Sequence, residues 1–163
     1  MHNLKINEAI VKHLNSLNLT ISTCESMTGG MVANSLVQVE NASKCFVGGF
    51  VSYSAFAKTK FAKVSEITID RYGTVSPECA KEMVSGTQSA FKSDITISVT
   101  GNASNANPIE GKPSGMAYVD IKVFDKIYEF KFVSKYNTRI DVINECTAFT
   151  LFNLWHLIKD LKK

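Results

Sequence analysis

The chain has 163 residues, of which 45% are apolar and 20% are charged, values typical of one globular domain with a packed core. Its net charge of +3 comes from scattered residues, which argues against nucleic acid as a partner. No stretch approaches the roughly 18 uninterrupted apolar residues of a membrane span, and the N-terminus lacks the pattern of a signal peptide. We therefore expect a single cytoplasmic domain over residues 1–163, with no membrane partner.

The cysteines do not form the spacing patterns of a metal site. Cys24, Cys45, Cys79 and Cys146 include no C-x-x-C pair and have no histidine pair nearby. Their dispersion predicts free thiols in a reducing compartment rather than a disulfide framework. The motifs HExxH and GxxxxGK[ST] are also absent, so we expect neither zinc hydrolysis nor P-loop chemistry.

The first half of the chain predicts alternating helices and strands. Apolar residues at three- and four-residue spacing predict helices over residues 4–17 and 31–39. Alternation over residues 19–24 predicts a strand between these helices. A second strand is predicted from Phe46 to Ser54, and a short helix follows from about Ala55.

The second half begins with a strong helix start at Ser76-Pro77-Glu78, which offers an N-cap serine, a proline at the first position and an acid in the first turn. Alternation over residues 95–99 predicts a strand that ends at Thr100-Gly101. Residues 101–114 are the longest stretch without periodicity, and a loop of this length in a small domain is often functional.

Two more alternating segments, residues 117–123 and 128–132, predict a hairpin broken at Asp125-Lys126. A last helix is predicted from near Thr138, with Asp141 completing a weak capping box. Its expected buried stripe consists of Ile140, Ile143, Thr147, Leu151, Leu154, Ile158 and Leu161. Helices mixed with strands and one late hairpin predict an α/β fold, a single-domain three-layer α-β-α sandwich with a mixed sheet.

Ser26 is the first candidate for chemistry, because it lies where the first strand passes into the second helix. A side chain at this place is exposed at the carboxyl end of the sheet, where open α/β folds bind ligands. Gly29 and Gly30 allow a ligand to approach the backbone, and free N–H groups of the new helix can hold an oxyanion or phosphate. An N-cap serine followed by turn glycines explains the same spacing, so both interpretations stay open.

Lys58 is the second candidate, because Ala55 and Ala57 flank it with small residues rather than charges. A lysine base needs a pKa near 7 or 8 instead of about 10.4, and burial beside Ser26 would supply that shift. A solvated surface lysine, as expected for Lys60, is the alternative.

Arg139 is the third candidate. It falls in the first turn of the last helix, where a cation opposes the helix dipole by roughly 0.3–1 kcal/mol. This placement is favourable if an anion binds both the arginine and the helix N-terminus. An exposed arginine at a frayed helix end explains the sequence equally well.

Five short motifs occur in order along the chain. They are Cys24-Glu25-Ser26-Met27-Thr28-Gly29-Gly30, Tyr53-Ser54-Ala55-Phe56-Ala57-Lys58, Gly73-Thr74-Val75-Ser76-Pro77-Glu78, Thr100-Gly101-Asn102-Ala103 closed by Lys112-Pro113-Ser114-Gly115, and Asn137-Thr138-Arg139. Together they resemble the C-terminal domain of the CinA family, the competence- and damage-inducible proteins, and its stand-alone nicotinamide-mononucleotide deamidases. The order and spacing match over roughly residues 5–158.

The resemblance implies hydrolysis of the carboxamide of nicotinamide mononucleotide to nicotinate mononucleotide and ammonia, without a cofactor or metal. It implies Ser26 as nucleophile, Lys58 as general base and Tyr53 orienting the lysine or the substrate. The residues expected to bind this nucleotide substrate are Thr28, Gly29, Gly30, Thr100, Gly101 and Arg139. The resemblance also implies a homo-oligomer, and the chain length suits the stand-alone form.

The chain departs from the family pattern at several positions. Met27 replaces a cysteine, Ala55 replaces an asparagine, and Ile143 stands where the family has an arginine. The glycine-rich Ile-Ala-Gly-Pro-Gly-Gly stretch is Asn-Ala-Ser-Asn-Ala-Asn at residues 102–107. These changes fall on the substrate-holding residues, so the alternative to an active deamidase is a catalytically silent or substrate-shifted nucleotide-binding module that keeps the fold.

Overall fold

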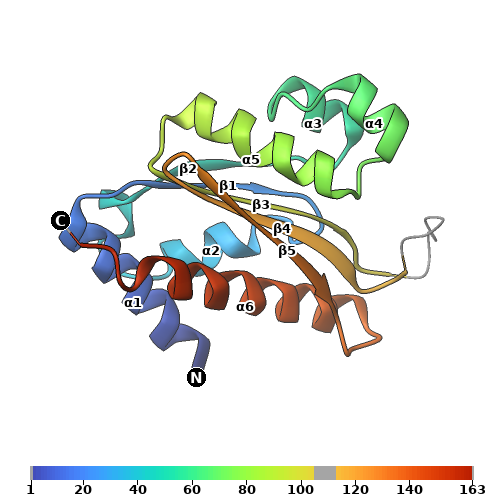
Figure 1. Ribbon diagram of the computed structural model, residues 1–163. Helices are drawn as coiled ribbons and strands as arrows, with labels where there is room; N and C mark the ends of the chain where they lie inside the picture. The colour runs from blue at the N-terminus through green and yellow to red at the C-terminus, as the bar shows by residue number, and fades with distance from the viewer. Residues whose placement is uncertain (1, 105–112, 163) are drawn as a thin grey trace.

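The computed structural model describes residues 2–104 and 113–162, and a five-stranded sheet lies at its centre (Figure 1). The strands are β1 (Ile21–Glu25), β2 (Phe46–Val51), β3 (Ile95–Asn102), β4 (Met116–Val123) and β5 (Lys126–Val133). Their order in the sheet is β2-β1-β3-β4-β5. β1 runs parallel to both β2 and β3, whereas β3, β4 and β5 are antiparallel neighbours, so the expected mixed sheet is confirmed.

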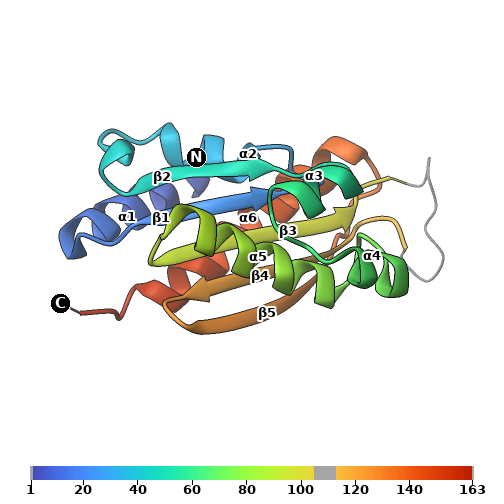
Figure 2. The same ribbon diagram turned by 90° about the horizontal axis from the view of Figure 1, so that it is seen from above.

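Helices cover both faces of this sheet (Figures 1 and 2). One face carries α1 (His2–Leu17), α2 (Met31–Val37) and α6 (Arg139–Ile158), and the other carries α3 (Ala55–Lys60), α4 (Glu66–Tyr72) and α5 (Pro77–Phe91). A short 3-10 helix, Ala42–Lys44, leads into β2. The predicted three-layer α-β-α sandwich is therefore confirmed. No helix in the described part of the chain is both long and apolar enough to cross a membrane.

The local signals for two helix starts and the hairpin are confirmed. Ser76 and Thr138 accept hydrogen bonds from backbone N–H groups in the first turns of α5 and α6, which satisfies donors that a helix start leaves unpaired. The hairpin turns at Phe124-Asp125, and Phe124 adopts a left-handed φ of 53°. A turn without glycine therefore joins β4 to β5.

Several boundaries differ from the prediction. β2 ends at Val51 instead of Ser54, and α2 ends at Val37 instead of residue 39. β3 continues to Asn102, so the first two residues of the expected loop 101–114 belong to a strand. Pairing with β4 extends that strand, and such a tertiary contact leaves no local sequence signal. Residues 105–112 of the expected loop lie outside the described residues.

The helix α4 was not predicted, because only Thr68 of its side chains is buried and no apolar stripe marks it. The buried stripe of α6 was partly wrong. Ile140 is 58% exposed, whereas Val142 and Cys146 are fully buried. The observed buried stripe therefore begins at Val142, whereas the predicted stripe began at Ile140, which lies on a different face of the first turn.

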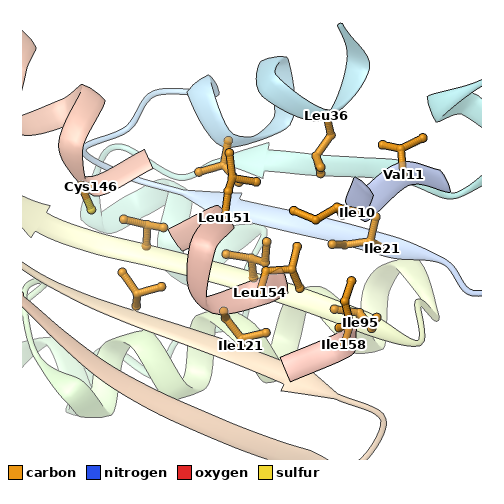
Figure 3. Packing of buried hydrophobic residues seen from close by; sticks show 14 of the residues in the cluster. Ile10, Val11, Ile21, Leu36, Ile95, Ile121, Cys146, Leu151, Leu154 and Ile158 are labelled. Carbon is orange, nitrogen blue, oxygen red and sulfur yellow. The ribbon is translucent and has the colours of Figure 1, made fainter. Parts of the chain in front are cut away.

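The two faces of the sheet differ in chemistry. The face that packs on α1, α2 and α6 is apolar, and Ile121 of β4 belongs to the same buried cluster as Ile10, Leu36 and Leu154 of those helices (Figure 3). The face that packs on α5 carries small polar side chains, which are Ser22, Thr96, Ser98 and Thr100, beside a small cluster of Cys24, Ala62, Val64, Cys79 and Met83. Hydroxyl groups on this face bond to one another or to the backbone of neighbouring segments. This face of the sheet therefore carries a row of polar side chains that extends towards the carboxyl ends of β1 and β3.

A close contact at Gly86 joins the segment after α3 to α5. A Cβ added at Gly86 would lie far inside 3.0 Å of the carbonyl oxygen of Ala62. Alanine in place of glycine normally stabilises a helix by about 1 kcal/mol. We expect Gly86→Ala instead to lower the free energy of unfolding by about 1–3 kcal/mol, because two backbone segments must separate.

Urea unfolding of Gly86→Ala and of Ser89→Ala, an exposed position on the same helix, tests this contact. Ser89→Ala is expected to change the free energy of unfolding by less than about 0.5 kcal/mol. A more stable Gly86→Ala protein would show that the two segments do not pack this closely.

Candidate active site

Ser26 and Lys58 meet in the structure although 32 residues separate them. The Lys58 Nζ lies 2.9 Å from the Ser26 Oγ and donates a hydrogen bond to the carbonyl oxygen of Ser52 at 2.6 Å. Lys58 is 1% exposed and Ser26 is 7% exposed. Lys58 is thus a buried side chain within hydrogen-bond reach of the serine, and not a solvated surface lysine.

The fold brings the pair together through the ends of two strands. Ser26 directly follows β1, and its N–H donates to the carbonyl oxygen of Val99 in β3 at 2.9 Å. Ser54 caps the start of α3 by accepting a hydrogen bond from the N–H of Ala57, and Lys58 follows one residue later. Figure 2 shows α3 and α4 over the end of the sheet at which β3 finishes. The serine therefore lies at the carboxyl edge of the sheet, where open α/β folds bind ligands.

Burial lowers the pKa of Lys58 from its ordinary value of 10.5, and the Cys79 and Cys24 sulfurs oppose this only in part. Burial also raises the pKa of Cys79, to about 11, so this thiol is neutral near pH 7. Within residues 2–104 and 113–162 no carboxylate forms a salt bridge with Lys58. A neutral amine can donate to Ser52 and accept from the Ser26 hydroxyl, whereas an ammonium group has no lone pair to accept with.

The turn after Ser26 is shaped by two glycines and by Glu25. Gly29 and Gly30 have φ values of 60° and 98°, in the left-handed region that favours glycine. The Glu25 side chain is 1% exposed, and its carboxylate accepts hydrogen bonds from the N–H groups of Gly30, Val32 and Ala33 at 3.1, 3.0 and 2.8 Å. The Gly29 N–H donates to the carbonyl oxygen of Ser26. The expectation that free N–H groups at the start of α2 can hold an anion is therefore wrong.

Two other N–H groups in this turn are available. Among the described residues, the backbone N–H groups of Met27 and Thr28 have no acceptor. A Cβ added at Gly29 would meet no atom within 4 Å, so the backbone there borders open space. The turn after Ser26 thus keeps two backbone donors without an internal acceptor. The Thr28 hydroxyl is also buried, and it has no partner among the described residues.

Thr100 and Gly101, expected to bind substrate, have contacts within the protein. The Thr100 hydroxyl donates to the carbonyl oxygen of Thr74 at 2.6 Å. A Cβ added at Gly101 would lie 2.5 Å from the Met27 Sδ and 2.5 Å from the Ala117 Cβ. The absence of a side chain at Gly101 therefore makes room for Met27, whose side chain is 3% exposed.

Tyr53 and Arg139 form a second polar group. The Arg139 Nη2 donates to the Tyr53 hydroxyl at 2.7 Å, and both side chains are exposed. Tyr53 follows Ser52, whose carbonyl oxygen accepts from Lys58, so the start of α6 lies near the segment that holds the lysine. Ser52, and not Tyr53, orients the Lys58 amine. The remaining N–H groups of the Arg139 guanidinium can bind an anion.

Sequence reasoning missed two contributors to this site. The Ser52 carbonyl oxygen has no side-chain signal, because a backbone group occurs at every position. Glu25 lies inside the first motif, and an acid close before a helix start is a recognised capping signal, but only the structure shows which N–H groups it takes. Among the described residues, no group of three or more His, Cys, Asp or Glu side chains is placed to hold a metal ion.

The fold and this edge of the sheet define an α/β domain with a buried serine–lysine pair at the end of a parallel strand. The sequence pattern of the CinA C-terminal domain matches residues 3–158, and the chain belongs to that family. A CinA-like protein from Fusobacterium nucleatum is 41% identical over 140 residues, which is 86% of this chain and 34% of that protein. Protein MG115 of Mycoplasma genitalium is 34% identical over 152 residues, which is 93% of this chain and 96% of that protein. The chain thus spans about a third of the first relative and almost all of the second.

Solved structures show the same fold. A CinA superfamily protein from Escherichia coli superimposes with a TM-score of 0.91 at 27% identity, covering 95% of this chain and 90% of that one. A competence/damage inducible protein from Agrobacterium tumefaciens superimposes with a TM-score of 0.92 at 25% identity, covering 96% of each chain.

The lowered pKa of Lys58 predicts a pH-dependent stability difference between the wild type and Lys58→Met. The unfolded chain holds the lysine proton more tightly than the folded protein, so the free energy of unfolding of the wild type rises with pH between the lowered pKa and 10.5. The rise relative to Lys58→Met is expected to reach about 1.4 kcal/mol per pH unit.

Urea unfolding at a series of pH values from about 7 to 10 measures this difference. Lys60→Met removes an exposed lysine from the same helix. Its free energy of unfolding is expected to change with pH in the same way as that of the wild type. Parallel curves for the wild type and Lys58→Met would mean that the pKa of Lys58 is not lowered.

Glu25→Gln tests whether the carboxylate positions the nucleophile turn. The amide keeps the shape of the side chain but turns an N–H group towards backbone donors, so the turn is expected to shift. We expect a fluorophosphonate to label Ser26 about 10- to 100-fold more slowly, because misplacement by about 1 Å has effects of that size.

Asp94→Asn is the matched control, because Asp94 accepts hydrogen bonds from the N–H and hydroxyl of Thr20 at the opposite end of β1. Intact-protein mass measured against time gives the labelling rate, and Asp94→Asn is expected to label like the wild type. A Glu25→Gln protein that also labels at the wild-type rate would contradict the positioning role.

Proposed function

We propose that this chain is a serine–lysine amidohydrolase that converts nicotinamide mononucleotide to nicotinate mononucleotide and ammonia. The observation that carries the proposal is the buried Lys58 amine, 2.9 Å from the Ser26 Oγ and without a carboxylate partner among the described residues. Burying an amine without a counter-charge is unfavourable, and such groups lose their proton instead. A pair of this kind suits an activated nucleophile and its base.

The first half of the reaction is an acyl transfer to the serine. Neutral Lys58 takes the proton from the Ser26 hydroxyl while the Oγ forms a bond to the carboxamide carbon. The Met27 and Thr28 N–H groups, which have no acceptor in the part of the chain that the structure describes, stabilise the oxyanion. The carbon–nitrogen bond then breaks, and Lys58 returns the proton to the leaving ammonia.

The second half releases the acid. Neutral Lys58 takes a proton from water, the resulting hydroxide attacks the ester carbon, and the carbon–oxygen bond to Ser26 breaks as the proton returns to the Oγ. The product is the free carboxylic acid, which ionises at neutral pH. Both halves use the same lysine as base and then as acid.

The Tyr53–Arg139 pair is the proposed site for the phosphate of the substrate. Glu25 already occupies the start of α2, so an anion does not find free N–H donors there. Arg139 is exposed, stands at the first position of α6 and is oriented by the Tyr53 hydroxyl. An arginine fork at a helix N-terminus suits a phosphate monoester.

The alternative function is a catalytically silent or substrate-shifted nucleotide-binding module. The Asn-rich segment that begins at Asn102 favours a changed substrate, because it replaces a glycine-rich stretch of the family pattern. The serine–lysine geometry favours catalysis over a silent module, since simple ligand binding does not require a buried amine.

Ammonia release from nicotinamide mononucleotide tests the proposed function. We expect Ser26→Ala and Lys58→Met to lower kcat/KM by at least about 10³-fold, because each removes a partner in the acyl transfer. We expect kcat/KM of the wild type to rise with pH to a plateau, with a midpoint below 10.5, because the base works in its neutral form.

Ser16→Ala, an exposed serine in α1, is the control and is expected to keep full activity. A folded wild-type protein that releases no ammonia would reject this substrate. Full activity in Ser26→Ala would reject the mechanism.

A further inference from the structure

Asn102 holds a buried hydrogen-bond donor that has no acceptor within residues 2–104 and 113–162. It is the last residue of β3, and only 9% of it is exposed. Its Oδ1 accepts a hydrogen bond from the N–H of Ser104 at 3.2 Å, which fixes the orientation of the amide. The Nδ2 is buried and has no acceptor among the residues that the structure describes. Buried donors are paired in the great majority of cases, so an unpaired one calls for an explanation.

The position of Asn102 places it beside the candidate active site. Side chains alternate along a strand, so Asn102 lies on the same face of β3 as Ser98 and Thr100. Those two hydroxyls bond to Ala80 of α5 and to Thr74, which precedes it, and α3 with Lys58 covers this same face of the sheet (Figure 1).

A backbone hydrogen bond and a close side-chain contact tie this end of β3 to the nucleophile turn. The carbonyl oxygen of Val99 accepts the Ser26 N–H, and a Cβ added at Gly101 would lie 2.5 Å from the Met27 Sδ. Asn102 therefore lies three residues beyond Val99, whose carbonyl oxygen accepts the hydrogen bond from Ser26.

A second unpaired group lies at the same edge of the sheet. The Thr28 side chain is 2% exposed, and its hydroxyl has no hydrogen-bond partner in the described part of the chain. Thr28 follows β1 and Asn102 ends β3, and these two strands are parallel neighbours. Two unsatisfied polar groups beside one nucleophile are the pattern of a site whose partners arrive with the ligand.

We propose that Asn102 is a substrate-contacting residue that determines specificity, its Nδ2 donating a hydrogen bond to an oxygen acceptor of the molecule bound at Ser26. The identity of that molecule rests on the proposed function, where the acceptor is an oxygen of the carboxamide, the ribose or the phosphate.

The test compares Asn102→Asp and Asn102→Leu with the wild type. Aspartate keeps the shape and the acceptor for Ser104 but replaces the donor with an acceptor, whereas leucine removes both without adding charge. We expect both variants to lower kcat/KM for nicotinamide mononucleotide by about 10- to 100-fold, mainly through KM, because a substrate oxygen loses its donor. Asn18→Asp, an exposed position at the opposite end of the sheet, is expected to behave like the wild type.

Nicotinamide riboside, which lacks the phosphate, separates the sources of the acceptor. A loss that appears with the mononucleotide and not with the riboside assigns the acceptor to the phosphate. An equal loss with both assigns it to the ribose or the carboxamide. Wild-type kcat/KM values in Asn102→Asp overturn the proposal, because that variant keeps the only hydrogen bond that a purely structural role requires.

If the wild type releases no ammonia from the mononucleotide, the proposed function fails and Asn102 is tested by ligand-induced thermal shift instead. The probes are ribose 5-phosphate, nicotinamide and inorganic phosphate, each with the wild type and Asn102→Asp. A shift in the wild type that Asn102→Asp lacks supports the donor role. Equal shifts in both proteins, or none in the wild type, overturn it.

Discussion

The burial of one lysine amine is the constraint on which the candidate site depends. Lys58 reaches Ser26 only because α3 lies over the carboxyl edge of the sheet, and α3 stays there because the chain after it packs on α5 at a glycine. The same burial lowers the pKa of the lysine, since an ammonium group loses more hydration than a neutral amine. The position of Lys58 and its lowered pKa therefore have the same physical origin, which is the exclusion of water from the space between α3, α5 and the sheet.

Glu25 determines which N–H groups near Ser26 remain available to a ligand. Its carboxylate takes three N–H groups at the start of α2 and so holds the turn that carries Ser26. In the proposed reaction, the N–H groups of Met27 and Thr28, which precede that helix, stabilise the oxyanion. The phosphate of the proposed substrate is assigned instead to Arg139 with Tyr53, at the start of α6. The proposed site thus separates the place where negative charge develops from the place where it is already present.

The unequal faces of the sheet explain why polar groups collect at this edge. The apolar face packs against α1, α2 and α6 and supplies most of the core (Figure 3). The opposite face is lined by serine and threonine side chains that bond to α5 and the segments beside it. Asn102 continues this polar row, and its Nδ2 has no acceptor among the described residues.

The amino-acid pattern alone predicts the fold class, the helix starts at Ser76 and Thr138, the hairpin and the candidates Ser26 and Lys58, because caps, alternation and short motifs act over a few residues. It does not predict α4, the length of β3 or the observed buried stripe of α6, since each depends on packing against distant segments. The three-dimensional contacts were needed to show that Lys58 is buried, that the Ser52 carbonyl oxygen accepts its hydrogen bond and that Glu25 caps the start of α2. Burial and hydrogen-bond pairing depend on residues that are close in space but distant in the sequence, so local sequence patterns do not specify them.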